Sequence, residues 1–167
     1  MPSTLHSALE SLSRELVDGT PAGAGWMLNP NDPGLLRSLD KLTAAAASAV
    51  PASGGTSIAA HVDHVRYGLS LLNLWAHGES NPWETADWSA SWTRVSVSDA
   101  QWAELRQSLA AETAAWIQAM GRSREYSHVE LMGVIASLGH LAYHLGAIRQ
   151  IDRSIRGPAE GTGAPAR

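Results

Sequence analysis

Cysteine is absent from the 167 residues, which excludes disulfide bonds, thiolate metal ligands and a cysteine nucleophile together. Phenylalanine is absent as well, so the seven tryptophans must supply most of the aromatic bulk. Basic residues are not in excess, and the net charge of −4 gives no electrostatic footprint for nucleic acid. We find no run of about 18 apolar residues without charge and no apolar signal core at the N-terminus, so we expect a cytoplasmic protein without a transmembrane helix.

Hydrophobic residues make up 44% of the chain, a globular composition, and the length favours a single folded domain. We assign this domain to residues 1–156 and expect residues 157–167, GPAEGTGAPAR, to form a flexible tail. Apolar residues at helical spacing predict five helices, at about residues 4–17, 33–49, 57–77, 98–120 and 127–154. No pattern of paired strands competes, so the predicted fold is an all-α bundle.

Two of the predicted helices begin with a capping box, at Ser98 to Gln101 and at Ser127 to Glu130. The long segment between the third and fourth helices has little periodicity but contains Trp83, Trp88 and Trp92. These side chains either line a pocket or only pack the segment onto the core, because so long a connection needs apolar contacts to hold it.

Two histidines lie four residues apart in the last predicted helix, within GHLAYHLG. Residues at this spacing share one helix face, so the side chains of His140 and His144 lie one above the other. Ala136 and Tyr143 lie on or near the same face, which is therefore expected to point inward. Two interpretations stay open: a pair of hydrogen-bonded histidines at the edge of the core, or two ligands of one metal ion. The zinc-protease motif is excluded because Leu141 stands where that motif has glutamate.

A metal site needs a third ligand, and His61 and His64 in the third predicted helix are the candidates. The apolar stripe of this helix places His61 nearer its middle, so periodicity alone slightly favours His61. Asp63 lies off the stripe and is expected to face solvent. The other histidines lie near predicted helix or chain ends and are expected at the surface: His6, His77 and His128.

The pairing of SIAAHVDHV with the later HLAYHLGAIRQI resembles the DinB-like (YfiT-like) superfamily of metalloproteins. In that family a small hydroxyl residue and an aliphatic residue begin a helix, a histidine follows about two turns later, and the last bundle helix carries His-x-x-x-His. Ser57 and His64 match the first element, and His140, His144 and Gly146 match the second. The resemblance covers about residues 5–154 and overrules the preference for His61.

The resemblance implies a four-helix bundle with an additional helix and a long Trp-rich connection. It also implies a divalent metal ion, commonly zinc or nickel, bound by His64, His140 and His144. Some relatives are enzymes that use a low-molecular-weight thiol as cosubstrate, so the resemblance favours a thiol-dependent S-transferase or isomerase acting on a small molecule. A metal-dependent hydrolase and a non-catalytic metal- or ligand-binding bundle are the alternatives. The expected partners are therefore the small-molecule substrate and a second copy of the chain in a homodimer. Nucleic acid and a membrane are not expected as partners.

Overall fold

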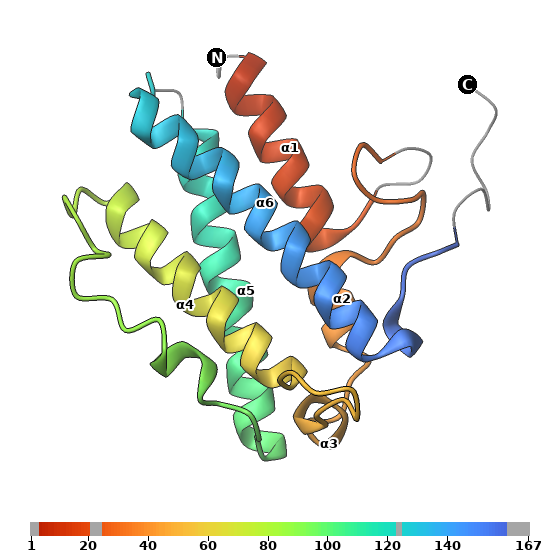
Figure 1. Cartoon of the computed structure of the whole chain (residues 1–167). Coiled ribbons are helices and arrows are strands. Elements are labelled where there is room, and N and C mark those ends of the chain that lie inside the picture. The colour runs from red at the N-terminus through yellow and green to blue at the C-terminus, as the bar shows by residue number, and fades with distance from the viewer. Residues whose placement is uncertain (1–3, 21–24, 123–124, 160–167) are drawn as a thin grey trace. The chain divides into compact units, whose positions relative to one another are not determined.

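The computed structural model describes residues 4–20, 25–122 and 125–159, and within them the chain is helical with no strand (Figure 1). The predicted all-α fold class is therefore confirmed. The elements of the described residues are α1 (Thr4–Asp18), α2 (Gly34–Leu39), α3 (Ala44–Ser48), α4 (Ile58–Ala76), the 3₁₀ helix η1 (Ala90–Trp92), α5 (Asp99–Gly121), α6 (His128–Ile151) and the 3₁₀ helix η2 (Arg153–Ile155).

The second predicted helix, residues 33–49, is wrong as a single element, because α2 and α3 replace it. Thr43 is the N-cap of α3 and begins this separate helix. Its Oγ1 accepts a hydrogen bond from the amide of Ala46 at 3.1 Å. The predicted start at Asp32 and Pro33 is close to the observed one. Asp32 Oδ1 accepts from the amide of Gly34 at 2.8 Å.

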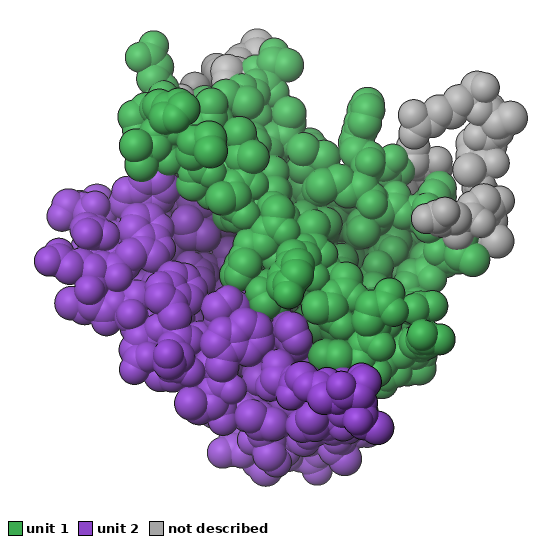
Figure 2. Space-filling model, viewed as in Figure 1, with its two compact units in different colours: residues 1–41, 120–167 green, residues 42–119 purple. Residues whose placement is uncertain are grey.

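The chain divides into two compact units, which Figure 2 colours separately: unit 1 comprises Met1–Lys41 and Met120–Arg167, and unit 2 comprises Leu42–Ala119. The assignment of residues 1–156 to a single domain stays a prediction. Of the predicted tail, residues 160–167 lie outside the described residues. Within the described part, the carbonyl of Pro158 accepts a hydrogen bond from Asn29 Nδ2 at 3.0 Å.

In unit 1, α1 packs against both α2 and α6 (Figure 1). Gly19 and Gly34 allow the end of α1 to meet the start of α2, and both have positive φ, at 90° and 67°. A Cβ on Gly19 would lie 2.1 Å from the carbonyl oxygen of Asp32, and one on Gly34 would lie 2.3 Å from the amide nitrogen of Gly19. Glycine is therefore needed at both positions for conformation and for space.

A buried ion pair ties the start of α2 to the end of α6. The guanidinium of Arg149 donates from both terminal nitrogens to the carboxylate of Asp32, at 2.6 and 2.9 Å. The two side chains are only 12% and 3% exposed. Such a pair is stable only when both partners are present, because removal of one leaves an uncompensated buried charge.

The loop after α1 is held by a carboxylate inside unit 1. Glu15 is buried, and its oxygens accept hydrogen bonds from three successive backbone amides, those of Trp26, Met27 and Leu28, at 2.9, 2.6 and 2.6 Å. A buried carboxylate needs such partners, because burial without them would be costly. The loop thus supplies the hydrogen bonds that keep Glu15 inside.

In unit 2, α4 begins at the N-cap Ser57, whose Oγ accepts from the amide of Ala60 at 3.3 Å. Asn73 on α4 donates from Nδ2 to the carbonyl and the carboxylate of Glu112 on α5, at 3.0 and 2.6 Å. Trp102 on α5 donates from Nε1 to the carbonyl of Leu42 at 2.9 Å. These bonds connect buried polar atoms of elements that are distant in sequence.

The most apolar helix among the described residues is α6, and by length and composition alone it could cross a membrane. The sequence did not predict an apolar segment of this length, because histidine, serine and glycine interrupt the apolar residues of α6. Length and apolar composition alone are weak evidence for a membrane span, because the core helix of a soluble protein can have both. In α6 the side chains of Val134, Leu141, Leu145 and Ile148 are buried. The cytoplasmic location stays a prediction.

Candidate functional site

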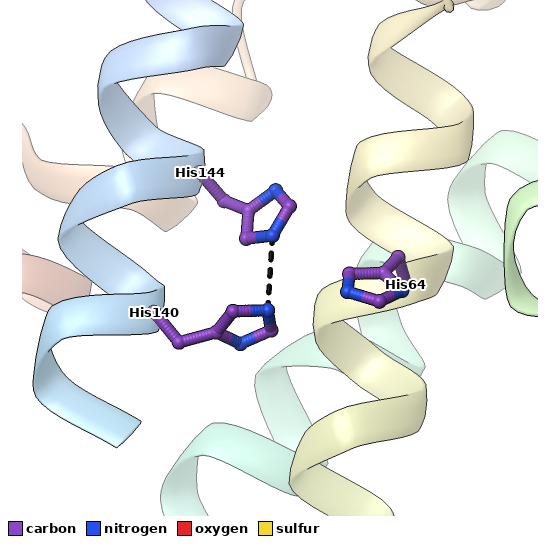
Figure 3. Close-up of side chains that lie close together, drawn as sticks. All are labelled: His64, His140 and His144. Carbon is purple, nitrogen blue, oxygen red and sulfur yellow. Dashed lines mark hydrogen bonds between the residues drawn. The ribbon is translucent and has the colours of Figure 1, made fainter. Parts of the chain in front are cut away.

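The histidine pair of α6 is formed within unit 1. The Nε2 atoms of His140 and His144 are 3.0 Å apart, and their rings lie 4.4 Å apart at 81° (Figure 3). Two ligands of one tetrahedral ion at 2.0–2.1 Å would have nitrogens about 3.3 Å apart. The contact is a hydrogen bond between the two rings, and its length is also close to the spacing of two ligands of one ion, so both interpretations of the pair fit it.

Burial favours the form of the His140 ring that can bind a metal. His144 is 1% exposed, and burial lowers the pKa of His140 below its usual value. Desolvation disfavours the charged imidazolium of His140, so its neutral ring, which alone has a free lone pair, is favoured at neutral pH.

The face of α6 around the pair is less buried than the sequence predicts. His144 points inward, but Ala136 is exposed and the ring of Tyr143 is 67% exposed. The ring of Tyr143 meets that of His144 edge-on at 5.0 Å. The inward face of α6 is instead centred on the leucine row of Leu138, Leu141 and Leu145, so the histidines lie toward its border.

His64 lies on α4 in unit 2, and its hydrogen bond to Ser91 sets which ring nitrogen carries the proton. His64 Nδ1 is 2.8 Å from Ser91 Oγ, and that hydroxyl lies 2.6 Å from the carbonyl oxygen of Trp88. A carbonyl oxygen only accepts, so the hydroxyl donates its hydrogen to Trp88 and must accept one from Nδ1. The neutral His64 ring is therefore protonated on Nδ1, which leaves the lone pair on Nε2, the arrangement typical of a metal ligand.

Tryptophans from the long connection enclose the same ring. Trp92 stacks on His64 with centroids 4.2 Å apart and an angle of 21°, and Trp88 lies at 5.6 Å. Trp83 contacts another residue, Trp75, edge-on at 5.2 Å. Trp88 and Trp92 therefore help to position His64, a role that the sequence could not separate from simple packing of the connection.

His61, the candidate that periodicity favoured, is also buried in unit 2. Its ring meets Trp92 edge-on at 5.2 Å, and burial lowers its pKa. Since His61 and His64 are 9% and 8% exposed, burial does not distinguish them. The choice of His64 as ligand stays a prediction, supported by the Ser91 contact and by the resemblance.

The expectation that Asp63 faces solvent is wrong. Asp63 is 6% exposed, and its carboxylate accepts from Arg66 Nε at 2.9 Å and from Arg94 Nε at 3.0 Å. Arg94 lies two residues after the end of η1, so this ion pair ties the Trp-rich connection to α4 one residue before His64. The position off the apolar stripe was recognised in the sequence, but the second arginine, 31 residues away, was not.

The surface positions expected for the other histidines hold for two of the three. His77 and His128 are exposed, whereas His6 is 4% exposed and stacks on Tyr126 at 4.9 Å and 23°. The position of His6 near the start of the chain did not predict its exposure, because Tyr126 covers the His6 ring within unit 1.

Unit 1 also contains a cavity of about 490 Å³ that the sequence did not reveal. Gly146, Arg149 and Gln150 of α6 line one wall, and the segment from Arg156 to Ala159 lines another. Arg149 follows His140 by nine residues, about 180° round the helix, so the cavity and the histidine pair lie on opposite sides of α6. The sequence prediction that Arg149 does not face the metal ligands agrees with its contact to Asp32.

Figure 3 draws three histidines whose ring nitrogens can serve as metal ligands: His64 on α4 of unit 2, and His140 and His144 on α6 of unit 1. Comparison with protein families gives a match to the DinB superfamily over residues 33–148. Comparison with curated proteins and with solved structures gives no match.

Proposed function

Because the chain belongs to the DinB superfamily, we propose that it binds one divalent metal ion, zinc or nickel, through His64, His140 and His144. The observation that carries the proposal is the 3.0 Å separation of the Nε2 atoms of His140 and His144, which are already spaced as two ligands of one ion. His64 supports it, since the bond to Ser91 leaves its Nε2 lone pair available. All three donors are imidazoles, which suit both metals.

A divalent ion held by three neutral imidazoles supplies a Lewis acid with open coordination positions. Within this proposal burial keeps the His140 imidazole neutral, and Ser91 orients His64. We favour a thiol-dependent S-transferase or isomerase acting on a small molecule. The chain has no cysteine, so a low-molecular-weight thiol would have to come from outside. In S-transfer the thiol gives its proton to solvent, its sulfur bonds to an electrophilic carbon, and the leaving group departs with the electron pair of the broken bond.

The metal-binding proposal is tested first by the metal content of protein purified without a nickel column or a chelator. Single His64→Ala, His140→Ala and His144→Ala changes should each lower occupancy sharply, because two ligands hold an ion poorly. His61→Ala is the matched control, since that side chain is as buried as His64. If His61→Ala strips the metal and His64→Ala does not, the assignment of His64 is wrong.

The catalytic proposal needs a separate test. Metal-loaded protein would be incubated with low-molecular-weight thiols and a panel of model electrophiles, beside the His140→Ala variant and metal-free protein. We expect faster loss of thiol only in the metal-loaded sample. Equal rates in all three samples would reject S-transfer, and the same metal-loaded protein would then be assayed for ester and amide hydrolysis.

A further inference from the structure

The cavity of unit 1 is separate from the histidine pair, because the two lie on opposite sides of α6. Its volume of about 490 Å³ falls within the range of about 300–1,000 Å³ that small-molecule sites occupy. Met27, Leu28 and Pro158 form apolar parts of the wall, and Asn29 and Gln150 form polar parts. The cavity therefore suits a small molecule that has both an apolar body and a polar group.

The charges in the cavity wall are not balanced. Asp32, Arg149 and Arg156 all line the cavity, and the carboxylate of Asp32 is already bonded by both terminal nitrogens of Arg149. Among the described residues, the partner of Arg156 is the neutral amide oxygen of Gln150, which accepts from Nη2 at 2.8 Å. The exposed guanidinium of Arg156 therefore keeps an uncompensated positive charge and further N–H donors. The Nε hydrogen of Arg149 also has no acceptor among the described residues.

The walls of the cavity are held in place by the protein itself. The loop that carries one wall is fixed by the three amide hydrogen bonds to Glu15. Asn29 Nδ2 joins this loop to the C-terminal segment through the carbonyl of Pro158, at 3.0 Å. Gly157 passes so close to the ion pair that a Cβ there would collide with the carboxylate of Asp32. Preformed walls favour binding, because little conformational freedom is lost when a ligand enters.

We propose that this cavity binds a small monocarboxylate with an apolar body, such as a short-chain fatty acid or an aromatic acid. The guanidinium of Arg156 bonds the carboxylate, because the planar N–H fork of arginine matches the two carboxylate oxygens in geometry and charge. Met27 and Leu28 contact the apolar body. A phosphate group fits less well, because it carries nearly two negative charges, and Asp32 in the same wall would repel the second.

The binding is tested with benzoate, and benzamide is its neutral counterpart of the same shape. The chain has four methionines, so carbon-13 NMR of the methionine methyl groups gives few signals. Met27 lines the cavity, whereas Met132 on α6 does not and serves as the control in the same spectrum. Benzoate should shift the Met27 signal to saturation and leave Met132 unmoved, with and without a chelator. It should bind about 10-fold more tightly than benzamide, the effect of a charge-assisted hydrogen bond. Hexanoate and hexanamide repeat the comparison with a flexible body.

Two substitutions test charge and shape separately. Arg156→Gln removes the charge, so benzoate and benzamide should then bind alike; Arg153→Gln, at an exposed arginine of η2 outside the cavity wall, is the control. Gly146 lines the cavity, and a Cβ there meets no atom within 4 Å, so Gly146→Leu adds a side chain to the wall without a clash in the protein. It should lower the benzoate affinity about 10-fold or more, because the new side chain takes the space of the ligand. Gly139→Leu, at an equally open glycine of α6 outside the wall, should leave the affinity unchanged.

The proposal is overturned if neither acid shifts the Met27 signal to saturation, or if each acid binds no better than its amide. Benzoate binding that Gly146→Leu leaves unchanged would overturn it as well, provided that circular dichroism shows the fold to be kept. Binding that requires the metal and leaves Met27 unmoved would place the acid at the metal instead. Tighter binding of inorganic phosphate than of benzoate would assign the cavity to phosphate, and both of these results would reject the proposed ligand or its site.

Discussion

Removal of the Ser91 hydroxyl should weaken metal binding without removing any ligand. Ser91 accepts the Nδ1 proton of His64 at 2.8 Å and donates to the carbonyl of Trp88 at 2.6 Å, and its side chain is buried. In Ser91→Ala the ring loses this acceptor, so the tautomer with the proton on Nε2 becomes accessible and competes with metal binding. Changes to such hydrogen-bond partners of metal-bound histidines typically cost 10- to 100-fold in affinity, or about 1.4–2.8 kcal/mol.

Two measurements distinguish this effect from a simple packing defect. Nitrogen-15 NMR of the histidine rings reports the tautomer of His64 in the metal-free protein, and competition with a chelator reports the zinc affinity. Ser91→Thr keeps the hydroxyl and should stay near the wild-type affinity. Ser89→Ala, an exposed position that caps η1 without a side-chain hydrogen bond, is the control and should change neither quantity.

The reasoning is refuted if Ser91→Ala leaves both the tautomer signals and the zinc affinity unchanged. A loss of affinity with an unchanged tautomer would also count against it, because the effect would then come from the connection rather than from the ring nitrogen. Unfolding in urea completes the comparison. Leaving a buried N–H without its acceptor should cost about 1–3 kcal/mol of stability in the metal-free protein.

Three further predictions concern pH and stability. Zinc affinity should fall as the pH drops below about 6.5, because protonated imidazole cannot bind a metal. Burial lowers the pKa of His140, so the loss of affinity caused by protonation of His140 should come at a still lower pH. A zinc affinity that does not change with pH would contradict the ligand set. Arg149→Met should lower the free energy of unfolding by about 3–5 kcal/mol, because it leaves the buried carboxylate of Asp32 unpaired. Adding Asp32→Asn to this variant should restore part of the lost free energy. If the two substitutions lower the free energy of urea unfolding additively, the two side chains are not coupled. Ser127→Ala should cost about 1 kcal/mol, because Ser127 and Glu130 form the observed reciprocal capping box of α6, and a melting temperature equal to that of the wild type would contradict this.

The sequence predicted the features that depend on local spacing. The long helices α1, α4, α5 and α6 were located by apolar periodicity, and both capping boxes exist: Ser98 and Gln101 exchange hydrogen bonds at 2.9 and 3.3 Å, as do Ser127 and Glu130 at 2.8 and 3.3 Å. These features are decided by residues three or four positions apart. The family was recognised in the same way, from two short motifs.

The features that were missed depend on residues far apart in the chain. Asp63 is buried because Arg94 reaches it, and His6 is buried because Tyr126 covers it. Ser91, whose contact sets the proton of His64, lies in a segment with no periodicity, so nothing in the sequence pointed to it. The break between α2 and α3 has a local cause, the cap at Thr43, but a threonine before four residues of good helix propensity looks the same inside a continuous helix.

The Asp32–Arg149 ion pair also bears on where this protein begins and ends as a folding unit. The stretch shared with the DinB superfamily runs from residue 33 to residue 148, so the two charges stand immediately outside it, one at each end. Their ion pair links the two ends of the shared stretch. Helix α1, which precedes this stretch, packs against α6. A fragment trimmed to the shared stretch would lose this fastening and expose apolar surface of α6 to water. We therefore expect the stable unit to extend beyond the family match at both ends.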